Sequence, residues 1–231
     1  MKPYINSIEN IVYNITKNDF RAVHRNDLGM LFVKENDITI KGIMVYIKDD
    51  EIKNITTFFN DQTVQSFFKS EYDKYSNYMI DDTCMQHLFD NVIDMKMLNQ
   101  LPISLVDEEG VEKACELLKQ YITQKAIPFF NYWQDIRDFI PFLETDDPIF
   151  IQDIFCGDGV EKKVIIWKLC NHPKYQNYVQ VLIQSYVDYL EENPNDKWAI
   201  KDFKKIKDIV KRLEKTEPLY TWDERYLIKK E

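Results

Sequence analysis

The chain has 231 residues, of which 45% are hydrophobic, 14% aromatic and 30% charged, and its formal net charge is −9 at pH 7. This composition excludes an intrinsically disordered chain and fits one large domain or two small ones. The acidic balance argues against nucleic acid as a partner, and charged residues interrupt every apolar run before it reaches the roughly 20 residues that span a membrane.

The amino-terminal residues and the cysteines bear on where the protein works. The segment that begins at Met1 lacks the apolar core of a secretory signal. None of the four cysteines belongs to a CxxC pair, which favours free thiols in a reducing compartment. The abundance of Ile, Asn, Lys and Tyr is typical of a low-GC bacterial genome. We therefore expect a bacterial protein with a cytoplasmic location.

The first part of the chain predicts one helix followed by a sheet. Apolar residues recur at helical spacing from Ile5 to Ile15, which predicts an amphipathic helix. Three β-branched or aromatic segments separated by turn-prone pairs then predict a three-stranded antiparallel meander. These segments are residues 30–34, 38–48 and 52–59. In the middle one the apolar positions change from even to odd numbers at Gly42, where we expect a β-bulge.

The remainder of the chain is mostly helical in pattern. A short helix is expected around Phe67, and the segment 79–93 is ambiguous and could hold a further strand. Asp107 has the features of a helix N-cap. The helices expected after it cover residues 107–127, 160–170, 175–192 and 196–215.

Together these elements predict an α+β fold with an N-terminal helix and an antiparallel β-meander, followed by a mostly helical C-terminal half. We expect a single domain over 1–231, in which residues 1–106 form the helix and sheet part and residues 107–231 the helical part.

Motifs for nucleotide or metal chemistry are sparse. The chain has five glycines and neither GxGxxG nor GxxxxGK[ST], so no Rossmann or P-loop site is expected. The glycine pair at 156–159 could form an anion nest, but Asp158 followed by Glu161 is typical of a capping box.

A zinc site is a further possibility, with cysteine and histidine ligands. Cys84 and His87 have the spacing of half a zinc site, which Cys170 and His172 could complete. The second pair is one residue too close for that ligand set, so we favour unrelated thiols and imidazoles. No metal and no cofactor are expected.

The negative charge is concentrated in one quarter of the chain. Residues 101–161 hold 4 Lys/Arg and 13 Asp/Glu, whereas the rest is balanced at 26 of each. Part of this charge, at 107–112, complements the first turn of a helix. The remainder, the acidic aromatic segment 126–161, carries 1 basic and 8 acidic side chains. Its Phe, Tyr and Trp residues are Phe129, Phe130, Tyr132, Trp133, Phe139, Phe142, Phe150 and Phe155.

The favoured hypothesis is a non-enzymatic protein-binding protein that covers a basic partner with this segment, because opposite charge speeds encounter and aromatic anchors supply affinity. The predicted contact residues are Tyr132, Trp133, Asp135, Asp138, Asp146, Asp147 and Asp153.

The alternative is a carboxylate- or metal-dependent hydrolase of unknown substrate that uses Asp146, Asp147, Asp153 and Asp158. A purely structural subunit is a third possibility. The basic helix at 196–215 is interpreted as a solvated face.

Two segments also carry a family resemblance. The stretch from Asp107 to Phe130, ending in Ala-Ile-Pro-Phe-Phe, and the stretch from Ile165 to Tyr175 resemble an uncharacterised bacterial family of the domain-of-unknown-function type. In size and acidity such proteins are similar to the immunity proteins that neutralise polymorphic toxins. The resemblance covers residues 1–190 in the order of elements. It implies an α+β fold, a cytoplasmic location and a protein-binding role, and it carries no catalytic residues.

Overall fold

The computed structural model describes residues 4–25, 29–68, 79–83 and 95–230. It shows the expected α+β fold, with an N-terminal helix, an antiparallel sheet and a mostly helical C-terminal half. The chain forms two compact units, one of Met1–Gln62 with Tyr75–Gln134 and the other of Thr63–Lys74 with Asp135–Glu231. The helical part expected from residue 107 onward is therefore divided between the units at residue 134. That the whole chain is a single domain stays a prediction.

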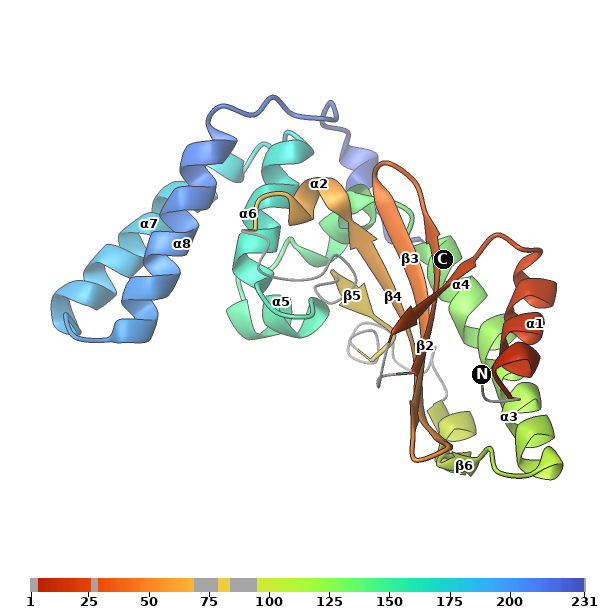
Figure 1. Ribbon diagram of the computed structural model, residues 1–231. Coiled ribbons are helices and arrows are strands. Elements are labelled where there is room, and N and C mark those ends of the chain that lie inside the picture. The colour runs from red at the N-terminus through yellow and green to blue at the C-terminus, as the bar shows by residue number, and fades with distance from the viewer. Residues whose placement is uncertain (1–3, 26–28, 69–78, 84–94, 231) are drawn as a thin grey trace. The chain divides into compact units, whose positions relative to one another are not determined.

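The first unit opens with helix α1 (Tyr4–Thr16), followed by a six-stranded sheet with antiparallel pairing (Figure 1). Five strands lie in chain order, and the sixth pairs with the opposite end of the fourth. They are β1 (Arg21–Arg25), β2 (Gly29–Glu35), β3 (Thr39–Lys48), β4 (Glu51–Asp61), β5 (Ile80–Asp81) and β6 (Ile103–Ser104). The predicted meander is confirmed as β2 to β4.

The predicted β-bulge at Gly42 is wrong. Pairing is continuous there, with Val33 on one side and Phe58 on the other, and the register shifts instead between Tyr46 and Ile47. The apolar positions change parity because β3 is buried on both faces, so Ile40 and Ile43 are both in the core. A Cβ at position 42 would lie 2.2 Å from the Phe58 ring, and glycine therefore suits this site.

The helices of the first unit complete its core. The chain passes through η2 (Met95–Gln100), α3 (Glu108–Tyr121), the π-helical turn η3 (Ile122–Ala126) and α4 (Ile127–Tyr132). Helices α1 and α3 pack together beside the sheet (Figure 1). Asp107 is the N-cap of α3 as predicted, since its carboxylate accepts a 2.8 Å hydrogen bond from the backbone N–H of Gly110.

A buried polar cluster joins α3 to the sheet. The carboxylate of Asp82, beside β5, accepts hydrogen bonds from Thr56 Oγ1 at 2.6 Å, from the backbone N–H of Thr57 at 3.2 Å and from the hydroxyl of Tyr121. Burial raises the pKa of Asp82 and of Tyr121, in spite of the hydrogen bonds that favour the Asp82 carboxylate. The cluster supplies the partners that these buried groups need.

The second unit is helical. Short helix α2 (Gln62–Gln65) leads into it. Its other elements are η4 (Ile136–Phe142), α5 (Pro148–Ile154), α6 (Gly159–Leu169), α7 (Tyr175–Glu192), α8 (Lys197–Leu213) and η5 (Glu224–Leu227). The helices predicted at 160–170, 175–192 and 196–215 are confirmed, and α7 and α8 form an antiparallel hairpin (Figure 1). Arg212 of α8 donates 2.7 Å hydrogen bonds to the carbonyl oxygens of Ser66 and Phe67.

The predicted capping box of Asp158 and Glu161 is also wrong. Asp158 has a φ of 56° and its side chain makes no capping hydrogen bond. Both carboxylates instead pair with Lys205 of α8, at 3.2 Å for Glu161. The N–H of Gly159 is bound by the side chain of Gln152 at 3.1 Å, so a group of this chain occupies a donor of the alternative anion nest.

Two expectations fall wholly or partly on residues outside the described ranges. Of the ambiguous segment 79–93 the structure describes residues 79–83, which include the strand β5, and residues 84–93 lie outside. Cys84 and His87 lie outside as well. Among the residues that are described, no helix is long and apolar enough to cross a membrane.

Candidate functional site

Most aromatic side chains of the acidic aromatic segment belong to the core. Phe129, Phe130, Trp133, Phe139, Phe142 and Phe155 are buried, and Tyr132 and Phe150 are half-buried. Trp133 is 0% exposed, so it has no surface for a partner in this structure. Tyr132 and Trp133 lie in the first unit, whereas the five predicted aspartates lie in the second. The sequence could not separate surface from core here, because both arrangements fit alternating charges and rings.

Asp135 and Asp138 have local structural roles at the start of η4. The two residues form a capping box, in which Asp135 accepts from the N–H of Arg137 at 2.8 Å and Asp138 accepts from the N–H of Asp135 at 3.2 Å. Burial acts to raise the pKa of Asp135, but hydrogen bonds from Arg137 hold it below its usual value. Asp138 pairs with Lys230 at 2.6 Å. Both carboxylates are therefore engaged within the chain.

The other three predicted aspartates lie on the surface around α5. Asp146 has a side chain that is 96% exposed, and Asp147 and Asp153 are exposed as well. Ile149 lies among them and is itself 71% exposed. Ile149 and Asp153 are four residues apart on a helix and share a face. We call Asp146, Asp147, Ile149 and Asp153 the acidic α5 face.

Sequence reasoning missed Ile149. Its sequence neighbours are apolar too, so it resembles a core residue. The available signal was its position, because the buried residues Ile151 and Ile154 are three residues apart and Ile149 does not continue that spacing. Asp147 also has a structural task, because it is the N-cap of α5 and accepts hydrogen bonds from the N–H groups of Ile149 and Phe150 at 2.9 and 3.3 Å.

A buried lysine holds the loop that leads into α5. Helix α6 is buried on nearly all sides, including Lys163, whose side chain is 0% exposed. Its Nζ donates a 2.6 Å hydrogen bond to the carbonyl oxygen of Thr145 and lies over the rings of Trp167 and Tyr178, at 4.3 and 4.2 Å from their centroids. Burial lowers the pKa of Lys163 to about 8.

His172 holds the same loop one residue earlier, at Glu144. Its ring stacks on Trp167 with centroids 4.1 Å apart, and its Nε2 lies 2.6 Å from Glu144 Oε1. The Nδ1 atom accepts from the N–H of Lys174 at 3.1 Å, so the proton of the neutral ring is on Nε2 and is donated to Glu144. Burial lowers the pKa of His172, which favours this neutral form. Glu144 also accepts from Lys174 Nζ at 2.7 Å.

These contacts fix the backbone on which the acidic α5 face depends. Thr145 is bonded to Lys163 within α6, and Glu144 is bonded to His172 in the turn after α6. Asp146 follows these two residues directly. Carboxylates on a fixed backbone lose little freedom on binding, which favours recognition of a cationic partner. Within the described ranges, no group of three or more His, Cys, Asp or Glu side chains is arranged to hold a metal ion. Of the proposed zinc ligands, Cys170 is buried and His172 has the two partners just described.

Comparisons with known proteins add no relative to this description. No family model, no curated protein and no solved structure matches the chain.

Proposed function

We propose that this chain is a non-enzymatic protein-binding protein whose acidic α5 face docks on a basic protein. The observation that carries the proposal is Ile149, an aliphatic side chain exposed by 71% that lies in the same short stretch of chain as the exposed residues Asp146, Asp147 and Asp153. Asp146 keeps a side chain that is 96% exposed, although one of its oxygens lies 3.9 Å from Lys163 Nζ. An apolar centre with a charged rim is the usual anatomy of a protein interface.

The charges give the partner its chemistry. Three carboxylates within eight residues favour a surface rich in Lys and Arg, and long-range attraction between the two surfaces accelerates their encounter. The affinity would come mainly from Ile149 entering an apolar pocket of the partner, where it is shielded from water.

A toxin-immunity role in the bacterial cytoplasm is the finer form of this proposal. It is supported by the acidic balance of the chain and by the resemblance to acidic immunity proteins of similar size. A nuclease toxin is a basic protein because it binds nucleic acid, so it would present the required charge.

The experiment uses the full chain and the basic product of a neighbouring gene, mixed in a calorimeter. We expect tight binding that weakens as salt is raised. The Ile149→Ser variant should bind about 30-fold more weakly, which corresponds to the loss of about 2 kcal/mol expected for a central anchor. The double variant Asp146→Asn with Asp153→Lys should slow association.

The control is a double variant with the same change of charge in the other acidic region, Glu108→Gln with Glu112→Lys on α3. It should bind like the unchanged chain. Asp135 and Asp138 are unsuitable targets because their substitution breaks the capping box of η4. Binding that is indifferent to salt, or an Ile149→Ser variant that binds as well as the control, would contradict the proposal.

A further inference from the structure

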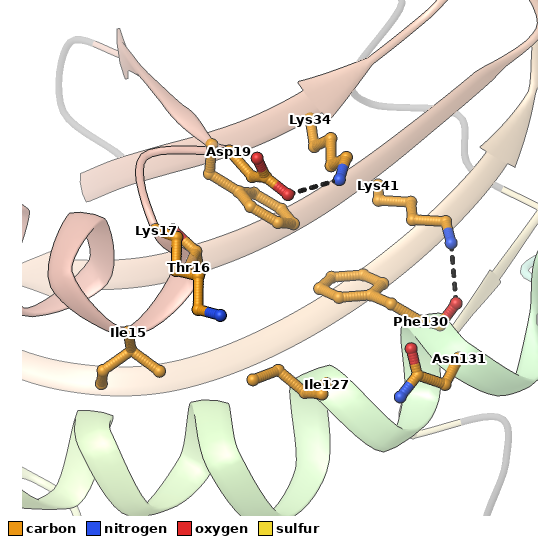
Figure 2. A pocket seen from close by; sticks show the side chains of 10 residues that line it. Ile15, Thr16, Lys17, Asp19, Lys34, Lys41, Ile127, Phe130 and Asn131 are labelled. Atoms are coloured by element: carbon orange, nitrogen blue, oxygen red, sulfur yellow. Dashed lines mark hydrogen bonds and ion pairs between the residues drawn. The ribbon is translucent and has the colours of Figure 1, made fainter.

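A pocket of about 220 Å³ opens within the first unit between α1, β2, β3 and α4 (Figure 2). Its walls come from the end of α1 and the turn that follows, from Lys34 on β2, from Lys41 on β3 and from the start and end of α4. The pocket combines cationic and apolar side chains, and both kinds restrict what it could bind.

The cationic side has more positive than negative charge. Three lysines, Lys17, Lys34 and Lys41, line the pocket together with one carboxylate, that of Asp19. Asp19 pairs with Lys34 at 2.6 Å. Lys41 donates a 2.7 Å hydrogen bond to the carbonyl oxygen of Phe130, which carries no net charge. The lining therefore carries more ammonium groups than carboxylates, which favours an anionic ligand.

Lys17 differs from Lys34 and Lys41 in its contacts. Among the described residues, no hydrogen bond or ion pair to its ammonium group is present, and the residue is exposed. Its φ of 54° is a left-handed conformation at the end of α1, where glycine or asparagine is the usual residue. Figure 2 shows the Lys17 side chain extending from the end of α1 toward the space beside Ile127 and the Phe130 ring.

The helix end beside the pocket would repel an anion if its carbonyl groups were free. They have donors of their own. The carbonyl oxygen of Tyr13 accepts from the N–H of Asn18 at 2.9 Å, and that of Thr16 accepts from the N–H of Asp19 at 3.0 Å. The hydroxyl of Thr16 donates to the carbonyl oxygen of Val12 at 2.7 Å. The unfavourable partial charge at this helix end is thus reduced.

The apolar side of the pocket can hold a flat group. Phe20 and Phe130 line it with ring centroids 5.4 Å apart, and Ile15 and Ile127 complete the apolar lining. Figure 2 shows Ile127 next to Phe130, with Ile15 at the end of α1. Aromatic rings favour offset or edge contacts with other rings. A volume of this size exceeds the roughly 150 Å³ that accommodates benzene in a protein interior, so one ring with a short anionic arm would fit.

We propose that this pocket binds a small organic anion, a single aromatic ring that bears a carboxylate or phosphate head. The ring lies against Phe20 and Phe130, and the head lies between the ammonium groups of Lys17 and Lys34. This site lies in the first unit and is independent of the acidic α5 face. Its success or failure says nothing about protein binding by α5.

The test titrates the full-length chain with 3-phenylpropionate and with phenyl phosphate, followed by ¹H–¹⁵N NMR. The two ligands distinguish the head groups, and the neutral amide 3-phenylpropionamide and the ring-free anion propionate are the comparison compounds. We expect saturable binding of at least one aryl anion with a dissociation constant of about 1 mM or lower. The perturbed backbone N–H signals should be those of residues 15–20, 34, 41, 127 and 129–131. The two comparison compounds, 3-phenylpropionamide and propionate, should bind at least fivefold more weakly than the aryl anion.

Two substitutions should change the affinity in opposite directions. Lys17→Asn removes the accessible charge and should weaken binding about fivefold or more, while asparagine accepts the left-handed backbone and keeps or raises the melting temperature. Asp19→Asn releases Lys34 and should tighten binding about two- to fivefold. A fold defect cannot produce both results.

The matched control is Lys48→Asn, which removes an exposed lysine of β3 about 23 Å along the strand from Lys41, at about 3.3 Å per residue. It should leave the affinity unchanged. The proposal is overturned if neither aryl anion binds saturably, if the neutral amide binds as tightly, or if Lys17→Asn and Lys48→Asn have equal effects.

Discussion

The ammonium group of Lys163 lies 2.6 Å from the carbonyl oxygen of Thr145, so a buried charge of α6 holds the loop that exposes Asp146. Removal of a cation from water is costly, and the rings of Trp167 and Tyr178 offset part of that cost. The stability of the second unit is therefore connected to the ionisation of one lysine.

The first prediction concerns the pH dependence of that lysine. Its pKa is lowered to about 8 in the folded chain, against 10.5 as the ordinary value. Between these values the unfolded chain binds a proton that the folded chain does not, so Lys163 contributes stability that rises with pH. We expect the free energy of unfolding of the unchanged chain to increase relative to Lys163→Met between pH 8 and 10.5. Urea denaturation at several pH values measures this difference, and a constant difference would contradict it.

The second prediction concerns the protonation of His172. At neutral pH its ring should carry the proton on Nε2, which long-range ¹H–¹⁵N NMR of the imidazole nitrogens detects directly. Its pKa is lowered by burial, so below the ordinary value of 6.5 the unfolded chain binds a proton first and stability falls as pH falls. His172→Gln should remove this part of the acid sensitivity. A ring protonated on Nδ1 at neutral pH would be the opposite result.

The third prediction concerns the buried polar cluster of the first unit. Tyr121→Phe removes the hydroxyl that donates to Asp82 and leaves a buried carboxylate oxygen with fewer donors. We expect a loss of about 1–3 kcal/mol in the free energy of unfolding, measured by chemical denaturation. Tyr46→Phe, at a half-buried tyrosine of β3, is the control and should change stability by less than about 0.5 kcal/mol. If the two substitutions lower the free energy of unfolding equally, the hydrogen bond from Tyr121 to Asp82 does not stabilise the fold as expected.

The fourth prediction separates two aspartates of the acidic α5 face. Asp147→Ala removes the N-cap of α5 and should lower stability by about 1 kcal/mol. Asp153→Ala changes an exposed residue in the same helix and should lower it by less than about 0.5 kcal/mol. Thermal unfolding of the two variants side by side measures the difference. If both melt at the same temperature, Asp147 does not cap the helix in solution.

The fifth prediction concerns Gly42. An added Cβ would lie 2.2 Å from the Phe58 ring, which is itself 1% exposed and cannot move into solvent. Gly42→Ala should therefore lower the free energy of unfolding by about 1–3 kcal/mol. The same substitution at Gly157 meets no atom within 4 Å, although its φ of 78° still disfavours alanine. A Gly42→Ala variant as stable as the unchanged chain would mean that the ring is displaced at little cost.

The elements that the sequence predicted correctly are those with local signals. The N-cap at Asp107 and the prolines near residues 173 and 194 mark helix ends through backbone chemistry that is independent of tertiary contacts. The meander was predictable for the same reason, because its turns carry turn-prone pairs. By contrast, the capping box at Asp158 failed because a long-range ion pair with Lys205 holds that carboxylate.

The candidate site was only partly predictable, because exposure is a tertiary property. The aspartates at 146, 147 and 153 are on the surface as polar residues usually are, but Trp133 is in the core. Lys163 was overlooked for the opposite reason, since lysines are almost never fully buried and nothing in the sequence distinguishes this one. The pocket of Figure 2 combines residues from four elements, and no single spacing in the chain indicates it.

The hydrogen bond from Arg212 to the carbonyl oxygen of Phe67 joins residues 145 positions apart. On a ribosome that adds roughly 5–20 residues per second, residues 63–68 would be made about 7–30 seconds before this partner. Val64 and Phe67 are buried in the finished protein. During those seconds α8, which carries Arg212, would not yet be present beside their segment. The second unit would therefore be completed last during synthesis, and a fragment that begins at Asp135 would lack a segment that the finished unit contains.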